Sequence, residues 1–274
     1  MKISFQGAKG AYSDLACREL YADAQTVPCT SFEDAFDAVK NGETDLAVIP
    51  IDNTLAGRVA DVHHLLPTSG LHIIGEHFLP IHHCLLGVKG ATLAGLNEVH
   101  SHVHAIPQCR QFIRDHNLKS HVHADTAGAA SEIGTRGDVT QGAIASKLAA
   151  EIYNLDILVE GIEDDKTNKT RFIVLSPNPV AVSGDNIMTS FVFEVRNIPA
   201  ALYKAMGGFA TNGVNMMKLE SYVDHKFNAA RFYCEISGHA DDANVVLAFD
   251  ELAFFAKDIK VLGSFAKSAL RDGF

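Results

Sequence analysis

Apolar and polar positions alternate in two ways along the first part of the chain. Short apolar runs, each as long as a buried strand, stand at residues 2–5, 46–49, 99–102, 121–124 and 142–145. Stretches with apolar residues at helical spacing, such as residues 31–41, lie between these runs. This alternation predicts α/β lobes with parallel strands.

The segment over residues 31–42 carries the signals that begin and end a helix. Ser31 is in position to cap the first turn. Glu33 and Asp34 follow it, where the helix dipole favours negative charge. Gly42 ends the pattern, so the spacing predicts a helix between Ser31 and Gly42.

A different pattern begins after residues 176–186, where Pro, Gly, Ser and Asn predict a linker and a domain boundary near Gly184. Beyond the linker, strand-like alternation covers residues 189–195, 214–223, 230–237 and 258–265, and helical spacing covers residues 199–213 and 241–257. The resulting order βαββαβ predicts a small ferredoxin-like sandwich.

Length and composition limit the class of protein. A chain of 274 residues exceeds the usual size of one hydrophobic core, so two or three lobes are expected. Although 47% of the residues are hydrophobic, no run reaches the roughly 20 apolar residues of a membrane-spanning helix. Gln6 and Gly7 interrupt the start before a secretion signal can form, and the five cysteines have no paired spacing. We therefore expect a cytoplasmic protein with reduced thiols and no membrane partner.

The charge excludes another class of partner. The formal net charge is −10, and no run of Lys and Arg is present in the sequence. A nucleic acid is therefore not expected as a partner. An anionic ligand would have to be held by helix N-termini and a few well-placed side chains.

Four segments share one local order, in which an apolar strand is followed by a turn of Gly, Ser, Thr or Asn and then by a helix. They are residues 7–13, 52–59, 101–109 and 125–130. The first N–H groups of a helix lack intrahelical partners and carry partial positive charge, so such turns can bind carboxylates at one edge of a sheet. The alternative interpretation is four ordinary helix caps.

The residues in these turns are similar to the motifs of a known family. GAKGAYS (residues 7–13) resembles Gly-Pro-x-Gly-Thr-[Phe/Tyr]-Ser, with Ala8 in place of Pro. PIDNTLAGRV (residues 50–59) resembles Pro-[Ile/Val]-Glu-Asn-Ser-x-x-Gly-x-Val, with Asp52 for Glu and Thr54 for Ser. SHVHAIPQC (residues 101–109) resembles Ser-His-Pro-Gln-Ala-x-x-Gln-Cys, with Val103 and His104 for Pro and Gln.

Further motifs follow in the same order. DTAGAA (residues 125–130) and GAIASKLAAEIYNLDIL (residues 142–158) are similar to Ser/Asp-Thr-Ala-x-Ala-Ala and Ala-Ala-Ile-[Ala/Gly]. NKTRF (residues 168–172) matches Asn-x-Thr-Arg-Phe, the most specific of these motifs. Each motif recurs by chance, but their order and spacing over nearly the whole chain resemble the prephenate dehydratases.

The resemblance implies a fold and a reaction. The fold is a two-lobed catalytic domain like a periplasmic-binding protein over residues 1–180, with lobes at about 1–75 with 165–180 and at 76–164. Its substrate, prephenate, would lie in the cleft between the lobes and lose CO2 together with its 4-hydroxyl to form phenylpyruvate. Aromatisation of the ring drives this reaction, so the resemblance implies no cofactor and no metal.

The resemblance also assigns roles to residues. Hydroxide is a poor leaving group, and a donor beside it contributes roughly 10²–10⁴-fold to the rate. By resemblance the donor is Thr170, with electrostatic support from Arg171. The alternative interpretation is that Thr170 is a strand residue with a solvent-facing hydroxyl and that Arg171 is a charged surface residue. The implied substrate-binding residues are Ser13, Asn53, Thr54, Gly57, Ser101, Thr126, Ala127, Asn168, Arg171 and Phe172.

Fourteen histidines raise the alternative of a metal site. His100, His102 and His104 alternate along one predicted strand, so their side chains would share a face. The same segment matches a motif of a metal-free family, and we identified no thiolate or carboxylate partner at ligand spacing. The histidines, including the pairs His63-His64, His82-His83 and His121-x-His123, are therefore predicted to be pH-sensitive surface or cleft residues.

The βαββαβ pattern over residues 188–274 is similar to an ACT domain, which in this family senses L-phenylalanine at a dimer interface. Ala200 stands in place of a glycine, and Tyr222 and Val223 stand in place of Arg-Pro. The resemblance implies feedback by phenylalanine and a homo-oligomer, either dimer or tetramer. The implied allosteric residues are Ala200, Ala201, Leu202, Asn215, Leu219, Glu220 and Ser221.

Two alternatives to a prephenate dehydratase remain open from the sequence. Arogenate differs from prephenate only at the side-chain keto or amino group, so an arogenate dehydratase has the same motifs. A non-catalytic sensor of amino acids could use the same scaffold. The intact NKTRF motif favours the enzyme, because a sensor has no use for a donor at that point.

Overall fold

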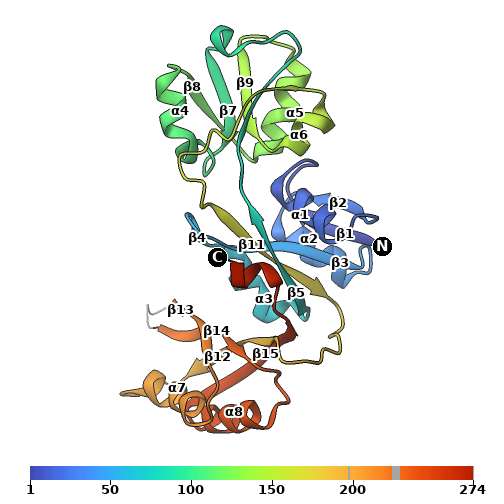
Figure 1. Cartoon of the computed structure of the whole chain (residues 1–274). Helices are drawn as coiled ribbons and strands as arrows, with labels where there is room; N and C mark the ends of the chain where they lie inside the picture. Colours follow the sequence, from blue (N-terminus) through green and yellow to red (C-terminus); the bar gives the residue numbers. More distant parts are fainter. Residues whose placement is uncertain (197, 224–228, 274) are drawn as a thin grey trace. The chain divides into compact units, whose positions relative to one another are not determined.

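A computed structural model describes residues 1–196, 198–223 and 229–273, which form three β-sheets with flanking helices (Figure 1). The predicted α/β class is confirmed. The chain divides into two compact units, Met1–Val59 with His77–Phe172 and Ala60–Glu76 with Ile173–Phe274. The helix α3 (Ala60–Ser69), which we placed in the first lobe, belongs to the second unit. The domain boundary near Gly184 stays a prediction.

The first sheet has the strand order β2-β1-β3-β11-β5, with β4 paired to β3. β1 runs parallel to β2 and to β3, as the alternation of strands and helices predicts. β11, which begins with Lys169 of the NKTRF motif, lies beside β3. The elements are β1 (Lys2–Gln6), α1 (Tyr12–Leu20), β2 (Gln25–Cys29), α2 (Phe32–Lys40), β3 (Leu46–Asn53), β4 (Gly57–Arg58), β5 (His72–Pro80) and β11 (Lys169–Ser176).

The predicted start and stop of helix α2 are confirmed. The Asp34 N–H donates to Ser31 Oγ at 3.0 Å, and the Ser31 N–H donates to Asp34 Oδ2 at 3.2 Å, which completes a capping box. The helix buries the side chains of Phe36 and Val39, and Gly42 adopts a φ of 72° just beyond its end. A helix with both ends specified in this way packs its apolar side against β1 and β3.

The second sheet has the strand order β10-β6-β9-β7-β8. β7 runs parallel to β8 and β9, but β6 pairs with β9 in the antiparallel direction, and β10 does the same with β6. The expectation of parallel strands alone was therefore wrong here, because apolar alternation does not encode strand direction. Helix α4 lies on one side of the sheet, and α5 and α6 lie on the other (Figure 1). The elements are β6 (Cys84–Gly87), β7 (Glu98–His102), α4 (Arg110–Asp115), β8 (Lys119–His123), α5 (Thr126–Arg136), β9 (Gln141–Ala145), α6 (Lys147–Tyr153) and β10 (Asp156–Glu160).

The third sheet confirms the predicted order βαββαβ in the C-terminal part of the chain, with the strand order β13-β14-β12-β15. Helices α7 and α8 cover one of its faces (Figure 1). A shared core of Phe191, Phe193, Phe209 and Leu252 joins the sheet to these helices. The elements are β12 (Ile187–Val195), α7 (Ala201–Thr211), β13 (Met216–Val223), β14 (Ala229–Ser237), α8 (Ala243–Phe255) and β15 (Ala256–Ala266).

Three short 3-10 helices complete the described elements: η1 (Leu93–Gly95), η2 (Ile106–Cys109) and η3 (Ala269–Gly273). Across the ranges that the structure describes, no helix combines the length and the apolar character needed to span a bilayer.

The substitution Ser31→Ala removes the hydroxyl that caps α2, so we expect it to lower the free energy of unfolding by about 1 kcal/mol. Urea denaturation monitored by circular dichroism measures this change. Ser183→Ala is the matched control, because Ser183 is an exposed residue of the linker. Equal stability of the two variants would show that the capping box does not contribute.

Candidate active site

Residues 52–59 form a hairpin, and our prediction of a direct strand-to-helix turn was wrong. β3 and β4 pair with Asn53 opposite Gly57, and Gly57 has a φ of 80° that favours glycine. The Asn53 Oδ1 accepts the N–H of Leu55 at 3.0 Å and the N–H of Ala56 at 2.8 Å. The side chain thus closes the turn on itself, and helix α3 begins only at Ala60.

The two backbone donors also determine the orientation of the Asn53 amide. Because its oxygen faces two N–H groups, its nitrogen must be the atom that faces residues 168–170. The Asn53 Nδ2 donates to Thr170 Oγ1 at 2.9 Å, to Asn168 Oδ1 at 2.8 Å and to the Lys169 carbonyl at 3.1 Å. The Thr170 oxygen is therefore an acceptor toward Asn53, and its own hydrogen can be donated to a ligand.

The hydrogen-bonded network continues from Asn168 across to the second sheet. The Asn168 Nδ2 donates to Gln108 Oε1 at 2.7 Å, and His83 Nε2 lies 2.9 Å from the same oxygen. His83 Nε2 must then carry a hydrogen, and its Nδ1 lies 2.8 Å from the Tyr12 hydroxyl, which also lies 2.8 Å from the His82 carbonyl. Thr170, Asn53, Asn168, Gln108, His83 and Tyr12 form one connected series, which we call the amide–imidazole network.

Burial maintains the neutral form of His83. The ring is 2% exposed, and this burial lowers its pKa from the ordinary value of 6.5, although the hydrogen bond with Gln108 and the charge of Glu163 act in the opposite direction. Burial also raises the pKa of Tyr12 well above 10.0, so its hydroxyl stays a donor. The network is therefore uncharged and has one arrangement of donors near neutral pH.

Glu163 supports the network from outside. It accepts the His83 N–H at 2.9 Å and lies 2.9 Å from His82 Nδ1. Burial by itself raises the pKa of Glu163, but these hydrogen bonds outweigh it, so the net pKa is lowered. An ionised Glu163 holds the backbone at residues 82–83 and with it the position of the His83 ring.

A cavity of about 360 Å³ lies beside the network. Gln108 belongs both to the network and to the wall of the cavity, and Leu55 and Ala56 come from the Asn53 turn. His104, which we noted as a departure from the family motif, also lines it. The complete lining is Leu55, Ala56, His104, Pro107, Gln108, Asp164 and Asp165.

The two aspartates of the cavity are already engaged by the protein. Asp164 accepts the Gln111 N–H at 3.0 Å, at the start of α4. Asp165 accepts the hydroxyl and the N–H of Thr167, at 2.6 and 2.8 Å, and these bonds lower its pKa. Their negative charge is therefore partly compensated, which reduces repulsion of an anionic ligand in the cavity.

Arg171 and Phe172 lie next to the network within β11, where both side chains are buried. The Arg171 guanidinium forms an ion pair with Asp52 at 3.6 Å and lies 6.0 Å from the centre of the Phe78 ring. Phe172 is 1% exposed, so it packs inside the protein. The alternative of Arg171 as a surface charge is thus excluded, and its charge is held inside the protein.

Several predicted substrate-binding residues lie outside the network. The Ser101 hydroxyl is fully buried and donates to the Ile144 carbonyl at 2.6 Å. Thr54 Oγ1 accepts the Lys169 N–H at 3.0 Å, so it joins β11 to the hairpin. Ser13 lies within α1, and Thr126 and Ala127 begin α5. None of these residues lines the cavity described above.

The helix N-termini hold carboxylates of the protein itself. Asp14 accepts the Gly10 N–H at 2.8 Å near the start of α1, and Asp125 accepts the Gly128 N–H at 2.6 Å at the start of α5. Together with Asp164 at α4, three of the four predicted turns have an internal acceptor. These carboxylates neutralise part of the positive potential that we predicted would bind an anionic ligand.

The predicted regulatory residues lie in the second unit. Ala201 and Leu202 begin α7, Asn215 precedes β13, and Leu219, Glu220 and Ser221 lie within β13. Ala200 has a φ of 61°, in the left-handed region that favours glycine. For a residue with a side chain this conformation costs roughly 1–2 kcal/mol, which explains why a glycine is usual at this place.

Four residues of the candidate site were missed in the sequence. Tyr12 and Gln108 lie inside the motifs of residues 7–13 and 101–109, so the motifs themselves contained the signal. His83 and Glu163 lie in no motif that we used. They become visible only when the second sheet brings β6 against the loop before β11.

Comparison with known proteins gives a consistent assignment. The prephenate dehydratase family model matches residues 3–180. A relative from Komagataeibacter europaeus, a bifunctional N-acyl-homoserine lactone acylase/prephenate dehydratase, is 44% identical, and the match covers 98% of this chain and 97% of the relative. Arogenate dehydratase/prephenate dehydratase 1 from Arabidopsis thaliana is 37% identical, and the match covers 99% and 73% of the two chains.

A solved structure has the same fold over almost the whole chain. Prephenate dehydratase from Arthrobacter aurescens in complex with L-Phe has 29% identity and a TM-score of 0.89, and the match covers 97% of this chain and 90% of that chain. The match extends beyond residue 180 and therefore includes the third sheet.

Because burial lowers the pKa of His83, the folded protein binds a proton there less readily than the unfolded chain does. We expect its contribution to stability to be complete above pH 6.5 and to be lost as the pH falls through the folded-state pKa. NMR titration of the His83 ring, with the urea-unfolded protein as control, measures both values. A folded-state pKa at or above the unfolded value would contradict a buried neutral ring.

Proposed function

The chain belongs to the prephenate dehydratase family of lyases, and we propose that it converts prephenate to phenylpyruvate. The observation that carries this proposal is the orientation of the Thr170 hydroxyl. Since Asn53 Nδ2 donates to Thr170 Oγ1 at 2.9 Å, the hydroxyl hydrogen is directed to another acceptor. The leaving 4-hydroxyl of prephenate is an acceptor that needs such a donor.

The reaction needs little more than this donor. The bond from the ring to its carboxylate breaks, and its electron pair enters the ring as CO2 leaves. The C–O bond at the opposite carbon breaks at the same time, and the departing hydroxide becomes water by taking a proton through the Thr170 hydroxyl, which solvent then supplies again. Thr170 hydrogen-bonds to the departing oxygen, while the Asn53 N–H stabilises negative charge that develops on the Thr170 oxygen.

The cavity beside Gln108 is the proposed place of the substrate. Its size of about 360 Å³ is within the range of small-molecule sites. The Gln108 oxygen is occupied by Asn168 and His83, so its amide hydrogens are available to a substrate carboxylate. We further propose that the backbone N–H groups of Thr126 and Ala127, with Ser13 and Ser101, complete the site when the lobes close.

A direct assay measures whether the protein prefers prephenate or arogenate as its substrate. Turnover of each compound by the purified protein, followed through phenylpyruvate or phenylalanine, tests the proposal. We expect higher kcat/KM for prephenate. Turnover of neither compound would contradict the proposed lyase and favour a sensor.

An acylase activity is named for the relative from Komagataeibacter europaeus. Amide hydrolysis by a covalent mechanism needs an activated nucleophile. The thiol of Cys109, next to Gln108, is fully buried, and this burial raises its pKa, so it is not activated. The geometry therefore favours the lyase, and release of fatty acid from an acyl-homoserine lactone is a separate arm of the assay.

We propose that the third sheet with α7 and α8 is an ACT-type regulatory module that binds L-phenylalanine. The related structure from Arthrobacter aurescens contains L-Phe, which supports this effector. Large apolar side chains, Tyr203 and Phe254, are 79% and 73% exposed on α7 and α8, which supports a homo-oligomer. Ala200 stays part of the proposed site despite its side chain.

A route from this module toward the catalytic hairpin runs through α3. The Tyr222 hydroxyl, on β13, hydrogen-bonds to His63 Nδ1, on α3. The His63 ring also packs edge-on against Tyr233 with ring centres 4.9 Å apart. α3 follows β4 after Val59, so a shift of β13 acts through α3 on the hairpin that orients Asn53. A ligand has such an effect only if its affinity differs between the two arrangements.

We expect Thr170→Ala to lower kcat by roughly 10²–10⁴-fold with a smaller change in KM, because the donor acts mainly as hydroxide departs. Steady-state kinetics with prephenate measures both constants. Thr135→Ala, at an exposed position of α5, is the matched control. Near-normal turnover by Thr170→Ala would remove this residue from the mechanism.

We expect L-phenylalanine to bind the full-length protein and to inhibit it, and Tyr222→Phe to weaken the inhibition more than the binding. The reason is that this variant loses the hydrogen bond to His63 but keeps the ring. Calorimetry gives the affinity, and prephenate turnover gives the inhibition. Tyr21→Phe is the control, since Tyr21 lies in the other unit.

Two results would contradict these regulatory proposals. The absence of binding at millimolar phenylalanine would mean that the module has no effector site for this amino acid. Unchanged inhibition in Tyr222→Phe would exclude the contact with His63 as the route. Reciprocity adds a check. If phenylalanine lowers the affinity for an unreactive substrate analogue by some factor, the analogue must lower the affinity for phenylalanine by the same factor.

A further inference from the structure

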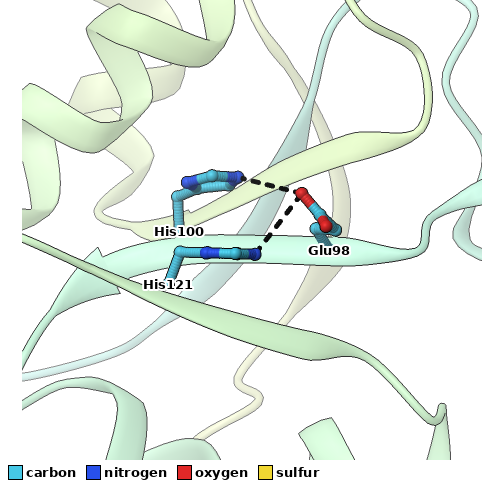
Figure 2. A group of neighbouring side chains, drawn as sticks. All are labelled: Glu98, His100 and His121. Atoms are coloured by element: carbon cyan, nitrogen blue, oxygen red, sulfur yellow. Dashed lines mark ion pairs between the residues drawn. The ribbon is translucent and has the colours of Figure 1, made fainter.

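A second cluster of chemically active side chains lies on the second sheet, apart from the amide–imidazole network. Glu98, His100 and His121 bring a carboxylate oxygen and two imidazole nitrogens within 4.8 Å of one another. Figure 2 shows both Nε2 atoms directed at the same oxygen of Glu98. Two imidazoles and one carboxylate are a common ligand set for transition metals.

Strand geometry explains this arrangement. Glu98 and His100 are two residues apart on β7, so their side chains point to the same face. His121 on β8 is the register partner of His100 in a parallel pair. The ladder of His100, His102 and His104 that we considered from the sequence is not formed, because His104 lies beyond the end of β7. The carboxylate that we failed to identify is Glu98, two positions before His100.

An ion pair and a hydrogen bond indicate which nitrogen of His100 carries the hydrogen. The Glu132 carboxylate, on α5, lies 3.1 Å from His123 Nδ1 and can only accept, so this nitrogen is an N–H. In the neutral ring His123 Nε2 then accepts, and it lies 2.9 Å from His100 Nδ1, which must donate. The lone pair of His100 is consequently on Nε2, the atom that faces Glu98.

Glu98 and His100 Nε2 are thus acceptors that face one another, and His121 Nε2 lies beside them. Glu98 Oε2 lies 3.4 Å from His121 Nε2 and 3.9 Å from His100 Nε2. Neither nitrogen has a hydrogen-bond partner among the described residues, and both are shielded from solvent. Since His100 is only 4% exposed, an unpartnered lone pair there is costly unless a cation lies between these atoms.

The spacing suits a metal ion better than a proton. Ligands at about 2.0–2.2 Å from zinc in tetrahedral geometry are roughly 3.3–3.5 Å from one another. The pair Glu98–His121 already has this separation. The rings of His100 and His121 stack with centres 4.8 Å apart and 15° between their planes, so they have to rotate for both lone pairs to reach one ion. A direct N–H···O bond would require a shorter distance.

We propose that Glu98, His100 and His121 bind one divalent transition-metal ion, with Zn²⁺ as the ion that fits best and water as the remaining ligand. His123 and Glu132 are positioning residues, because they hold the Nδ1 hydrogen of His100 and direct its lone pair to the metal. The side chains of His121 and Glu98 are 34% and 29% exposed, so the site lies close to the protein surface.

Two cations near the site moderate its affinity. Lys119 Nζ lies 3.8 Å from Glu98 Oε1, the carboxylate oxygen that faces away from the histidines. Arg136 is paired with Glu132, and its other nitrogen donates to Gln141 at 2.9 Å. The net charge of Glu98, Glu132, Lys119 and Arg136 is zero, so the histidine nitrogens supply most of the binding. This is a further reason to expect zinc, which prefers nitrogen, over calcium or magnesium.

The site has a structural consequence for the second sheet. A metal held by β7 and β8 joins the two strands in addition to their backbone pairing. β7 continues into the segment with His104 and Pro107, which line the cavity. The ion therefore stabilises the strand from which this wall of the cavity begins, without contact with Thr170.

Calorimetric titration of the chelator-treated full-length protein with Zn²⁺ tests the proposal, in the absence of any substrate. We expect one zinc per chain and a higher temperature of unfolding with zinc. Replacement of zinc by Co²⁺ should give the visible absorption of a four-coordinate site. Glu132→Gln should weaken binding by roughly 10–100-fold, as expected for a residue that orients a ligand.

The ligand variants Glu98→Gln and His121→Asn should lose zinc binding at the concentration that saturates the wild type. His116→Asn is the matched control, because His116 is exposed at the end of α4 and should leave binding unchanged. Circular dichroism without metal confirms that each variant is folded. Absence of zinc binding in the wild type, or unchanged binding in both ligand variants, would overturn the proposal. Neither result bears on prephenate turnover, so this site and the proposed function fail independently.

Discussion

The fixed orientation of the Asn53 amide is the constraint on which the candidate active site depends. Two N–H groups of its own hairpin hold the oxygen, so the nitrogen has to donate toward β11. Thr170 is an acceptor for that reason, and its hydroxyl hydrogen becomes available to a leaving group. In the proposed reaction the chemistry rests on hydrogen-bond direction more than on the acidity of any group.

The same constraint extends through the buried part of the site. Asn168 and His83 both donate to the Gln108 oxygen, so the network fixes the orientation of the Gln108 amide. Burial keeps His83 neutral, and the ionised Glu163 anchors the backbone beside it. An uncharged network of this kind suits a substrate that brings its own negative charges, because it offers donors without binding counter-ions too tightly.

The acidic composition of the chain is compatible with this design. Asp14, Asp125 and Asp164 accept N–H groups near helix starts, and Asp165 is held by Thr167. Many of the acidic residues therefore satisfy internal donors and repel an anion less than the net charge indicates. On the second sheet, Glu98 and Glu132 have a different environment, with imidazole rings instead of backbone N–H groups. Because of this difference we assign a metal ion to the cluster of Glu98, His100 and His121. We assign the organic anion to the cavity beside the amide–imidazole network.

The sequence by itself determined the α/β class, the helix from Ser31, the βαββαβ order and the family, because these depend on local periodicity, capping and the order of short motifs. It also predicted that Asn53, Asn168 and Thr170 belong to one site. Only the tertiary structure decided that residues 52–59 form a hairpin, that β6 and β10 are antiparallel, and that His83 and Glu163 support the site. It also showed that Glu98 joins His100 and His121, and that α3 contacts β13. The physical reason is that strand direction, register and contacts between distant segments are set by packing and hydrogen bonds across the fold, which no local pattern of residues encodes.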